Sequence, residues 1–178
     1  FTSHHSTTPT KRKSVEQLSQ KMVDDFISGE IPVFSALKET DYAEKLLNIC
    51  RHELSDFDHL VVFGTGGAAL GGMTLCQTMP LKSTKKVSFC PNLDCDELNT
   101  IFSHSLLKTA FLIVSKSGHT IETICQAAMA RQKLDEQNLS AQTHMFFLTT
   151  PQSSPLSDMA QELNATNFPC DPSISGRY

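Results

Sequence analysis

A chain of 178 residues is long enough for one globular domain with an ordinary hydrophobic core. Hydrophobic residues make up 39% and charged residues 19%, and no run approaches the roughly 18 continuous apolar residues that a membrane-spanning helix needs. A net charge of −4 gives no general electrostatic attraction to nucleic acid, and the start of the chain does not resemble a secretory signal. We therefore expect a cytoplasmic protein that binds neither membrane nor nucleic acid.

The cysteines indicate neither a disulfide framework nor a zinc site. No two of them form a CxxC pair, and most lie in apolar segments, where a free thiol behaves as a small hydrophobic group. We expect no metal and no cofactor. The six cysteines are Cys50, Cys76, Cys90, Cys95, Cys125 and Cys170.

The first part of the chain predicts a tail followed by two flanking helices. Residues 1–12 are polar and lack a periodic apolar pattern, so we expect a flexible tail. Over 13–57, Ser14 is a predicted N-cap, and apolar residues then recur at helical spacing until Gly29, where the helix should end. A second helix is predicted over 41–54.

The remaining residues, 58–178, alternate between short apolar runs and segments of helical length. This alternation predicts an α/β fold, namely a three-layer αβα sandwich around a doubly wound, mainly parallel sheet of five strands. The predicted strands are 60–63, 87–89, 110–114, 145–148 and a short one near 167–168; the predicted helices are 68–79, 94–107, 120–136 and 155–164. In such sheets, ligands bind beyond the carboxyl ends of the strands.

The first of these strands ends in a glycine-rich segment, residues 64–72 (GTGGAALGG). Glycines allow a ligand to approach main-chain N–H groups closely. The spacing also fits the G-x-G-x-x-G/A fingerprint of dinucleotide-binding proteins, but no acidic residue stands at 83–89, where that fingerprint needs one. A tight strand-to-helix turn without a ligand is the alternative explanation of the glycines.

The segment 115–120 (SKSGHT) follows the predicted strand 110–114 and predicts a phosphate site. Three hydroxyls, a glycine and the start of a helix supply donors and a favourable helix dipole for an anion. A helix cap rich in serine is the alternative. The sequence G-x-x-x-x-G-K of a Walker A loop is absent. His119 has no identified partner, so we do not expect it to be catalytic.

A third segment, Ser175-Gly176-Arg177-Tyr178, follows the last predicted strand. Arginine offers a planar, permanently charged group that suits a phosphate or an oxyanion. An arginine near a chain end is common at protein surfaces, so this segment alone indicates little.

Together the three segments resemble the phosphosugar isomerase (SIS) superfamily and, more narrowly, the phosphoglucose isomerase family. Ser-x-Ser-Gly-x-Thr after an apolar strand is the superfamily's phosphosugar-binding signature, and residues 115–120 carry it. The narrower resemblance rests on Gly-Thr-Gly-Gly with Leu-Gly at 64–71, on Ile-Ser-Gly-Arg-Tyr at 174–178, and on Asn-Leu-Asp at 92–94. It covers about residues 55–178.

The resemblance implies interconversion of glucose 6-phosphate and fructose 6-phosphate, a step of glycolysis and gluconeogenesis, by proton transfer through an enediolate. It also implies a homodimer for the full-length protein. The family's base glutamate and its ring-opening histidine and lysine belong to segments beyond residue 178, so we expect this chain alone to be inactive. By residue, the resemblance implies Arg177 as the catalytic group that stabilises the enediolate, and Gly66, Gly67, Ser115, Lys116, Ser117 and Thr120 as the substrate- and phosphate-binding set.

The chain departs from the family pattern at two positions. Ala68 stands where many members have serine, which removes one hydroxyl, and Ser175 replaces the first glycine of the terminal motif. Neither departure overturns the resemblance, and Ala68 is the one that bears on the sugar contacts.

Two other functions remain open on the sequence. A phosphosugar-sensing transcriptional regulator with this fold would carry a basic DNA-binding domain ahead of it, whereas residues 14–58 are net acidic. A sugar-phosphate isomerase of a single-domain type would not need the terminal Gly-Arg-Tyr. The first of these is the main alternative to an isomerase.

Overall fold

The computed structural model describes residues 9–28, 40–79 and 85–170. These residues divide into two compact units, one within 1–47 and one within 48–178. The terminal segment 171–178, with Arg177, lies outside the described residues, as do 1–8 and the predicted helix stop at Gly29.

The first unit contains helix α1 (Pro9–Ser28) and the beginning of α3 (Thr40–Glu53). Helix α1 begins five residues before the predicted cap, so residues 9–12 are helical and not part of a tail. Proline favours the first turn of a helix, because its φ is already helical and its missing N–H would have no partner there. The apolar side chains of Val15, Leu18 and Met22 are 61%, 63% and 66% exposed.

The second unit is built on a five-stranded parallel sheet, as predicted. Its strands are β1 (His59–Phe63), β2 (Lys86–Cys90), β3 (Thr109–Ser115), β4 (Met145–Thr149) and β5 (Thr166–Pro169). They lie in the order β2-β1-β3-β4-β5, and every neighbouring pair is parallel. The chain therefore winds outward in both directions from β1 and β3, which form the switch point of a doubly wound fold.

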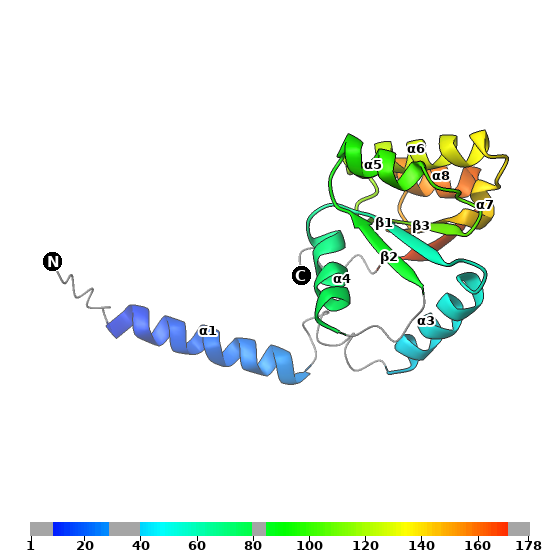
Figure 1. Cartoon of the computed structure of the whole chain (residues 1–178). Helices are drawn as coiled ribbons and strands as arrows, with labels where there is room; N and C mark the ends of the chain where they lie inside the picture. Colours follow the sequence, from blue (N-terminus) through cyan, green and yellow to red (C-terminus); the bar gives the residue numbers. More distant parts are fainter. Residues whose placement is uncertain (1–8, 29–39, 80–84, 171–178) are drawn as a thin grey trace. The chain divides into compact units, whose positions relative to one another are not determined.

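Helices cover both faces of this sheet and complete the predicted three layers. In Figure 1, α4 lies on one face, whereas α5, α6 and α8 lie on the other. The helices are α4 (Gly67–Thr78), α5 (Cys95–Phe102), α6 (Ile121–Glu136), the single turn α7 (Ala141–His144) and α8 (Pro155–Glu162).

Two helices differ from the prediction for identifiable reasons. Helix α5 stops at Phe102, short of the predicted 107, because the chain turns to bury Leu106 fully. The N–H of Leu106 donates to Oε1 of Gln137 at 3.0 Å, which satisfies the backbone outside a helix. The turn α7 was not predicted; its buried His144 pairs through Nδ1 with the carbonyl of Thr109 at 2.8 Å.

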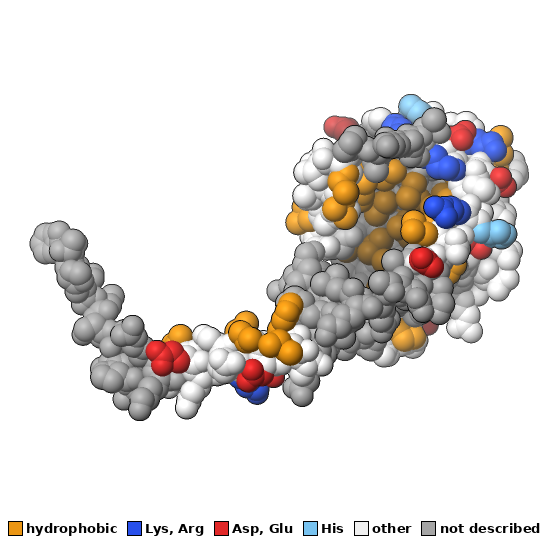
Figure 2. All heavy atoms as spheres, turned by 90° about the horizontal axis from the view of Figure 1, so that it is seen from below, with side chains coloured by type: hydrophobic (Ala, Val, Ile, Leu, Met, Phe, Trp, Pro, Cys, Tyr) orange, Lys and Arg blue, Asp and Glu red, His pale blue; other side chains and the backbone are white. Residues whose placement is uncertain are grey.

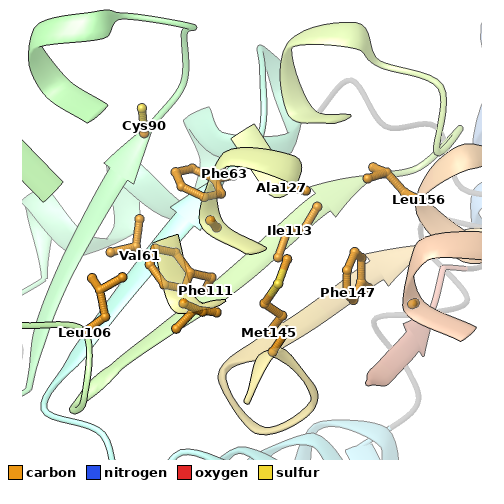
Figure 3. Close-up of a cluster of buried hydrophobic side chains, with 14 of the residues drawn as sticks. Val61, Phe63, Cys90, Leu106, Phe111, Ile113, Ala127, Met145, Phe147 and Leu156 are labelled. Atoms are coloured by element: carbon orange, nitrogen blue, oxygen red, sulfur yellow. The ribbon is translucent and has the colours of Figure 1, made fainter. Parts of the chain in front are cut away.

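The main core lies between the sheet and the layer of α5, α6 and α8 (Figure 3). The stacked rings of Phe63 and Phe111 have centroids 5.6 Å apart, and Leu134 of α6 is fully buried in the same cluster. Each such side chain contributes roughly 1.5–3 kcal/mol relative to an exposed one. This packing fixes the direction of α6, whose first turn lies at the carboxyl edge of the sheet.

The opposite face of the sheet carries a smaller buried cluster of Phe57, Ala110 and Phe146. Leu60 and Leu112 pack against it but remain half-buried. Figure 2 views the molecule from this side and shows hydrophobic side chains gathered in a hollow. Within the described ranges, this face is therefore less completely covered than the other.

Across the parts of the chain that the structure describes, no helix is both long and apolar enough to cross a bilayer. The same parts contain no group of three or more His, Cys, Asp or Glu residues that is arranged to hold a metal ion.

A hydrogen bond between a histidine and a serine joins β1 to β2 near the amino edge of the sheet, away from the strand ends that carry the glycines. His59 of β1 is hydrogen-bonded through Nε2 to Oγ of Ser88 in β2 at 2.8 Å. Partial burial lowers the pKa of His59, and the positive charges of Lys86 and His104 lower it further. The folded state therefore favours the neutral imidazole.

This preference predicts a pH dependence of stability. Because the unfolded chain binds the proton at about pH 6.5 and the folded chain only at lower pH, the free energy of unfolding should fall as the pH drops below about 6.5. A His59→Gln variant lacks this titration, so its stability should fall less steeply over the same range. Urea unfolding at a series of pH values measures both slopes, and parallel curves would contradict the assignment.

Candidate functional site

The switch point between β1 and β3 opens into a pocket of about 610 Å³ at the carboxyl edge of the sheet. The loops that follow the two strands form most of its wall, and one residue comes from the segment after β4. The lining residues are Thr65, Gly66, Gly67, Ala68, Val114, Ser115, Lys116, Ser117, Thr120 and Thr150.

The loop after β1 turns directly into α4 at a glycine. Gly66 has φ 53° and ψ −127°, a backbone conformation that side-chain-bearing residues rarely adopt, and it occupies the N-cap position of α4. Within the described part of the chain, the N–H groups of Gly66 and Gly67 donate to no backbone carbonyl. The first turn of α4 therefore presents unused donors beside the pocket.

The loop after β3 is closed at its base by two hydroxyls. Ser115 is 3% exposed, and its Oγ lies 3.0 Å from Oγ1 of the half-buried Thr120. The N–H of Gly118 donates to Oγ of Ser115 at 3.2 Å, and Gly118 itself has φ 69°. Thr120 holds the N-cap position of α6, but its side chain makes no capping bond because it pairs with Ser115.

The outer part of the same loop carries Ser117 and His119. Oγ of the exposed Ser117 accepts from the N–H of His119 at 3.2 Å. The imidazole of His119 is exposed, and its Nδ1 pairs with the carbonyl of Ser117 at 2.7 Å. The imidazole of His119 is thus hydrogen-bonded within its own loop. Its position in the sequence beside the phosphate-site residues does not by itself make it an acid or a base.

The electrostatics of the pocket favour an anion. The N–H groups of Ser117 and Thr120 donate to no acceptor among the described residues. Two helices, α4 and α6, begin at the pocket, and each helix N-terminus carries the equivalent of about half a positive charge. Lys116 is the one charged side chain in the described lining. Hydroxyls, main-chain donors and a lysine together are the usual components of a phosphate site.

The pocket brings together six of the seven residues that the sequence singled out. The structure places Gly66, Gly67, Ser115, Lys116, Ser117 and Thr120 around one hollow. The seventh, Arg177, lies outside the described residues. Sequence reasoning missed Thr65, Val114 and Thr150. Thr150 could have been predicted, because it follows an apolar run at the end of a strand, as Ser115 does.

The neighbouring loop after β2 is held by structural bonds. The carboxylate of Asp94 caps α5 by accepting from the N–H groups of Asp96 at 2.8 Å and Glu97 at 3.1 Å. The buried Gln126 of α6 donates through Nε2 to the carbonyls of Cys90 at 3.0 Å and Asn92 at 2.9 Å. Asp94 is therefore committed to a helix cap, and no acidic side chain appears in the described lining to hold a dinucleotide ribose.

A second pocket, of about 420 Å³, lies between α8 and β5. Its lining includes Ser153, Ser157 and Asn167, together with the carboxylate of Asp158. A carboxylate repels an anion. Of the described helix N-termini, only that of α8 lies near this lining, whereas two helices begin at the larger pocket. The larger pocket therefore has the better chemistry for a phosphate.

Several curated proteins with related sequences are named glucose-6-phosphate isomerases. A glucose-6-phosphate isomerase from Treponema denticola is 32% identical over 125 residues, which cover 68% of this chain and 23% of that protein. One from Chlamydia trachomatis is 29% identical over 178 aligned positions, covering 88% of this chain and 33% of the relative. This chain thus spans about a quarter to a third of the length of these curated relatives.

Solved structures share the fold. The crystal structure of a glucose-6-phosphate isomerase from Chlamydia trachomatis has a TM-score of 0.67 and 29% identity, over 76% of this chain and 26% of that one. The Vibrio vulnificus NanR protein complexed with ManNAc-6P has a TM-score of 0.57 and 20% identity, over 96% of this chain and 59% of that one. The second likeness concerns the fold alone. Residues 49–178, well over half of the chain, match the sequence profile of the phosphoglucose isomerase family, and the chain therefore belongs to that family.

Proposed function

We propose that the pocket between β1 and β3 binds the phosphate group of glucose 6-phosphate and fructose 6-phosphate, and that the chain is the phosphate-binding part of a glucose-6-phosphate isomerase. The observation that carries the proposal is the convergence of two helix N-termini and five hydroxyl-bearing residues on one pocket. Family membership over 49–178 supports a sugar phosphate as the ligand.

In this proposal, the hydroxyls of the loop 115–120 have different roles. Oγ of the almost fully buried Ser115 lies 3.0 Å from Oγ1 of Thr120. We assign Ser115 as the donor in this pair, which leaves the hydroxyl proton of Thr120 for the phosphate. Ser117 is exposed and donates directly, and Lys116 adds a positive charge at the rim. Hydrogen bonds to a charged group are the strong ones, at roughly 1.5–3 kcal/mol each.

Isomerisation moves a proton between C1 and C2 of the open-chain sugar through an enediolate. It needs a base for that proton and positive charge near the oxyanion that forms. We propose that Arg177 supplies this charge, as the matching arginine of the family motif is expected to do. No carboxylate occurs in the described lining of the pocket, so proton transfer needs a group from elsewhere.

Ala68 makes the wall of the pocket less polar than a serine at the same position would. It lines the pocket within the first turn of α4 and cannot donate a hydrogen bond from its methyl group. We propose that the phosphate, and not the sugar ring, contributes most of the binding energy in this chain.

The phosphate site predicts the effect of removing one hydroxyl. A Ser117→Ala variant should bind glucose 6-phosphate about tenfold or more weakly, because it loses a hydrogen bond to a charged group. Isothermal titration calorimetry measures the dissociation constant. Ser153→Ala is the matched control: its exposed hydroxyl bonds Asp158 at 3.2 Å in the other pocket and should not matter. Equal affinities for both variants would place the ligand elsewhere.

The absence of a base in the described lining predicts that this chain binds substrate without converting it. General acid–base help is worth typically about 10²–10⁴-fold, so its loss should reduce turnover to background. A coupled dehydrogenase assay with fructose 6-phosphate measures the formation of glucose 6-phosphate. Turnover by the purified chain near the rate of a full-length relative would show that a base lies within it, and Glu122 and His119 would be mutated first.

A phosphosugar-sensing regulator would instead bind DNA. The net charge of −4 and the acidic residues 14–58 predict no retention of duplex DNA in a mobility-shift assay at low salt, where non-specific binding is strongest. Tight retention that depends on the DNA sequence would favour the regulator over the isomerase.

A further inference from the structure

The segment that joins β4 to α8, together with the first turn of α8, is hydrogen-bonded to the loop 115–120. The N–H of Thr150 donates to the carbonyl of Lys116 at 3.0 Å, and the N–H of Leu156 donates to the carbonyl of Gly118 at 3.3 Å. In a trans peptide the C=O and the following N–H point in opposite directions. Holding the carbonyl of Lys116 on this side therefore turns the N–H of Ser117 to the other side.

A side chain in the same segment fills the space beside Gly118. A Cβ added to Gly118 would overlap Oγ of Ser154, lie 2.6 Å from Cβ of Ser154, and lie 3.0 Å from Oγ1 of Thr149. Ser154 is only 3% exposed, and its Oγ accepts from the N–H of Ser157 at 3.2 Å as the N-cap of α8. Ser154 thus cannot move aside without loss of that cap.

We propose that Ser154 is a positioning residue for the phosphate loop. Its side chain, fixed by the cap of α8, sets how closely Gly118 approaches β4, and so keeps the positive-φ turn that aims the loop's N–H groups at the anion. Ser154 is not among the described residues that line the pocket, so it would act through the loop. The inference rests on the proposed phosphate site and adds the residue that sets its geometry.

A double-mutant cycle tests this directly. Gly118→Ala should weaken glucose 6-phosphate binding about tenfold or more, because its Cβ overlaps Ser154 and its φ is strained. Ser154→Gly removes both overlapping atoms, whereas Ser154→Ala would keep the Cβ. Glycine is also an adequate N-cap, so α8 should persist. Ser154→Gly alone should weaken binding about threefold. Added to Gly118→Ala, the same change should instead strengthen binding about threefold relative to Gly118→Ala alone, which is strong non-additivity.

The control separates positioning from stability. Ser157→Ala removes the other hydroxyl of the same capping box, which accepts from the N–H of Ser154 at 2.8 Å and from its Oγ at 3.1 Å. The variant leaves Ser154 with its cap bond from the N–H of Ser157 and with the two atoms that lie beside Gly118. It should lower the melting temperature and leave the dissociation constant within about twofold. If Gly118→Ala does not fold, the amide signals of Ser117 and Thr120 in ¹H–¹⁵N spectra should shift in Ser154→Gly and stay unchanged in Ser157→Ala.

Two outcomes would overturn the proposal. An unmodified chain that binds neither glucose 6-phosphate nor inorganic phosphate would refute the phosphate site, and the inference with it. An unmodified chain that binds, with additive effects in the cycle or equal amide shifts in Ser154→Gly and Ser157→Ala, would refute the positioning role alone and leave the phosphate site intact.

Discussion

The parallel pairing of β1 with β3, in the register that sets Phe63 beside Ile113, determines where the two glycine-bearing loops meet. Because both strands end at the same edge, the segment after Phe63 and the segment after Ser115 open toward one another. The chain leaves these strands toward opposite faces of the sheet, so α4 and α6 begin on either side of the gap. One pairing thus produces a pocket with a helix N-terminus on each flank.

The stacked core beneath the pocket keeps that arrangement rigid. Phe63 and Phe111 stack within the sheet, and Leu134 anchors the far end of α6 in the same cluster. Gln126, further along α6, ties the helix to the loop after β2. A site that depends on the direction of N–H groups needs such support, because a misdirected donor loses most of its hydrogen-bond energy.

The repeating elements of the fold could be predicted from the sequence, since apolar runs and helical periodicity report burial directly. All five strands and the α4, α6 and α8 helices lie close to their predicted positions. The early stop of α5 could not be predicted, because it depends on burial of Leu106 in a tertiary core. The start of α1 at Pro9 differs from the prediction because residues 9–12 carry no periodic apolar pattern, and only the preference of proline for a first helical turn marks it.

The same distinction holds at the site. A strand followed by hydroxyls and glycine was enough to predict that residues 115–120 and Gly66 and Gly67 would lie at the sheet's carboxyl edge. The contact between Ser154 and Gly118 was beyond prediction, because it joins residues 36 positions apart in the chain through the shape of a loop. Side-chain pairs that act across neighbouring strand ends leave no periodic signal in a single sequence.

The central claim is that a phosphate binds between the loops after β1 and β3. A crystal structure of the chain with glucose 6-phosphate tests it most directly. The account predicts phosphate oxygens within hydrogen-bond distance, about 2.7–3.2 Å, of Ser117 and Thr120, at the first turn of α6. A phosphate seated in the pocket between α8 and β5, or at another surface, would contradict it.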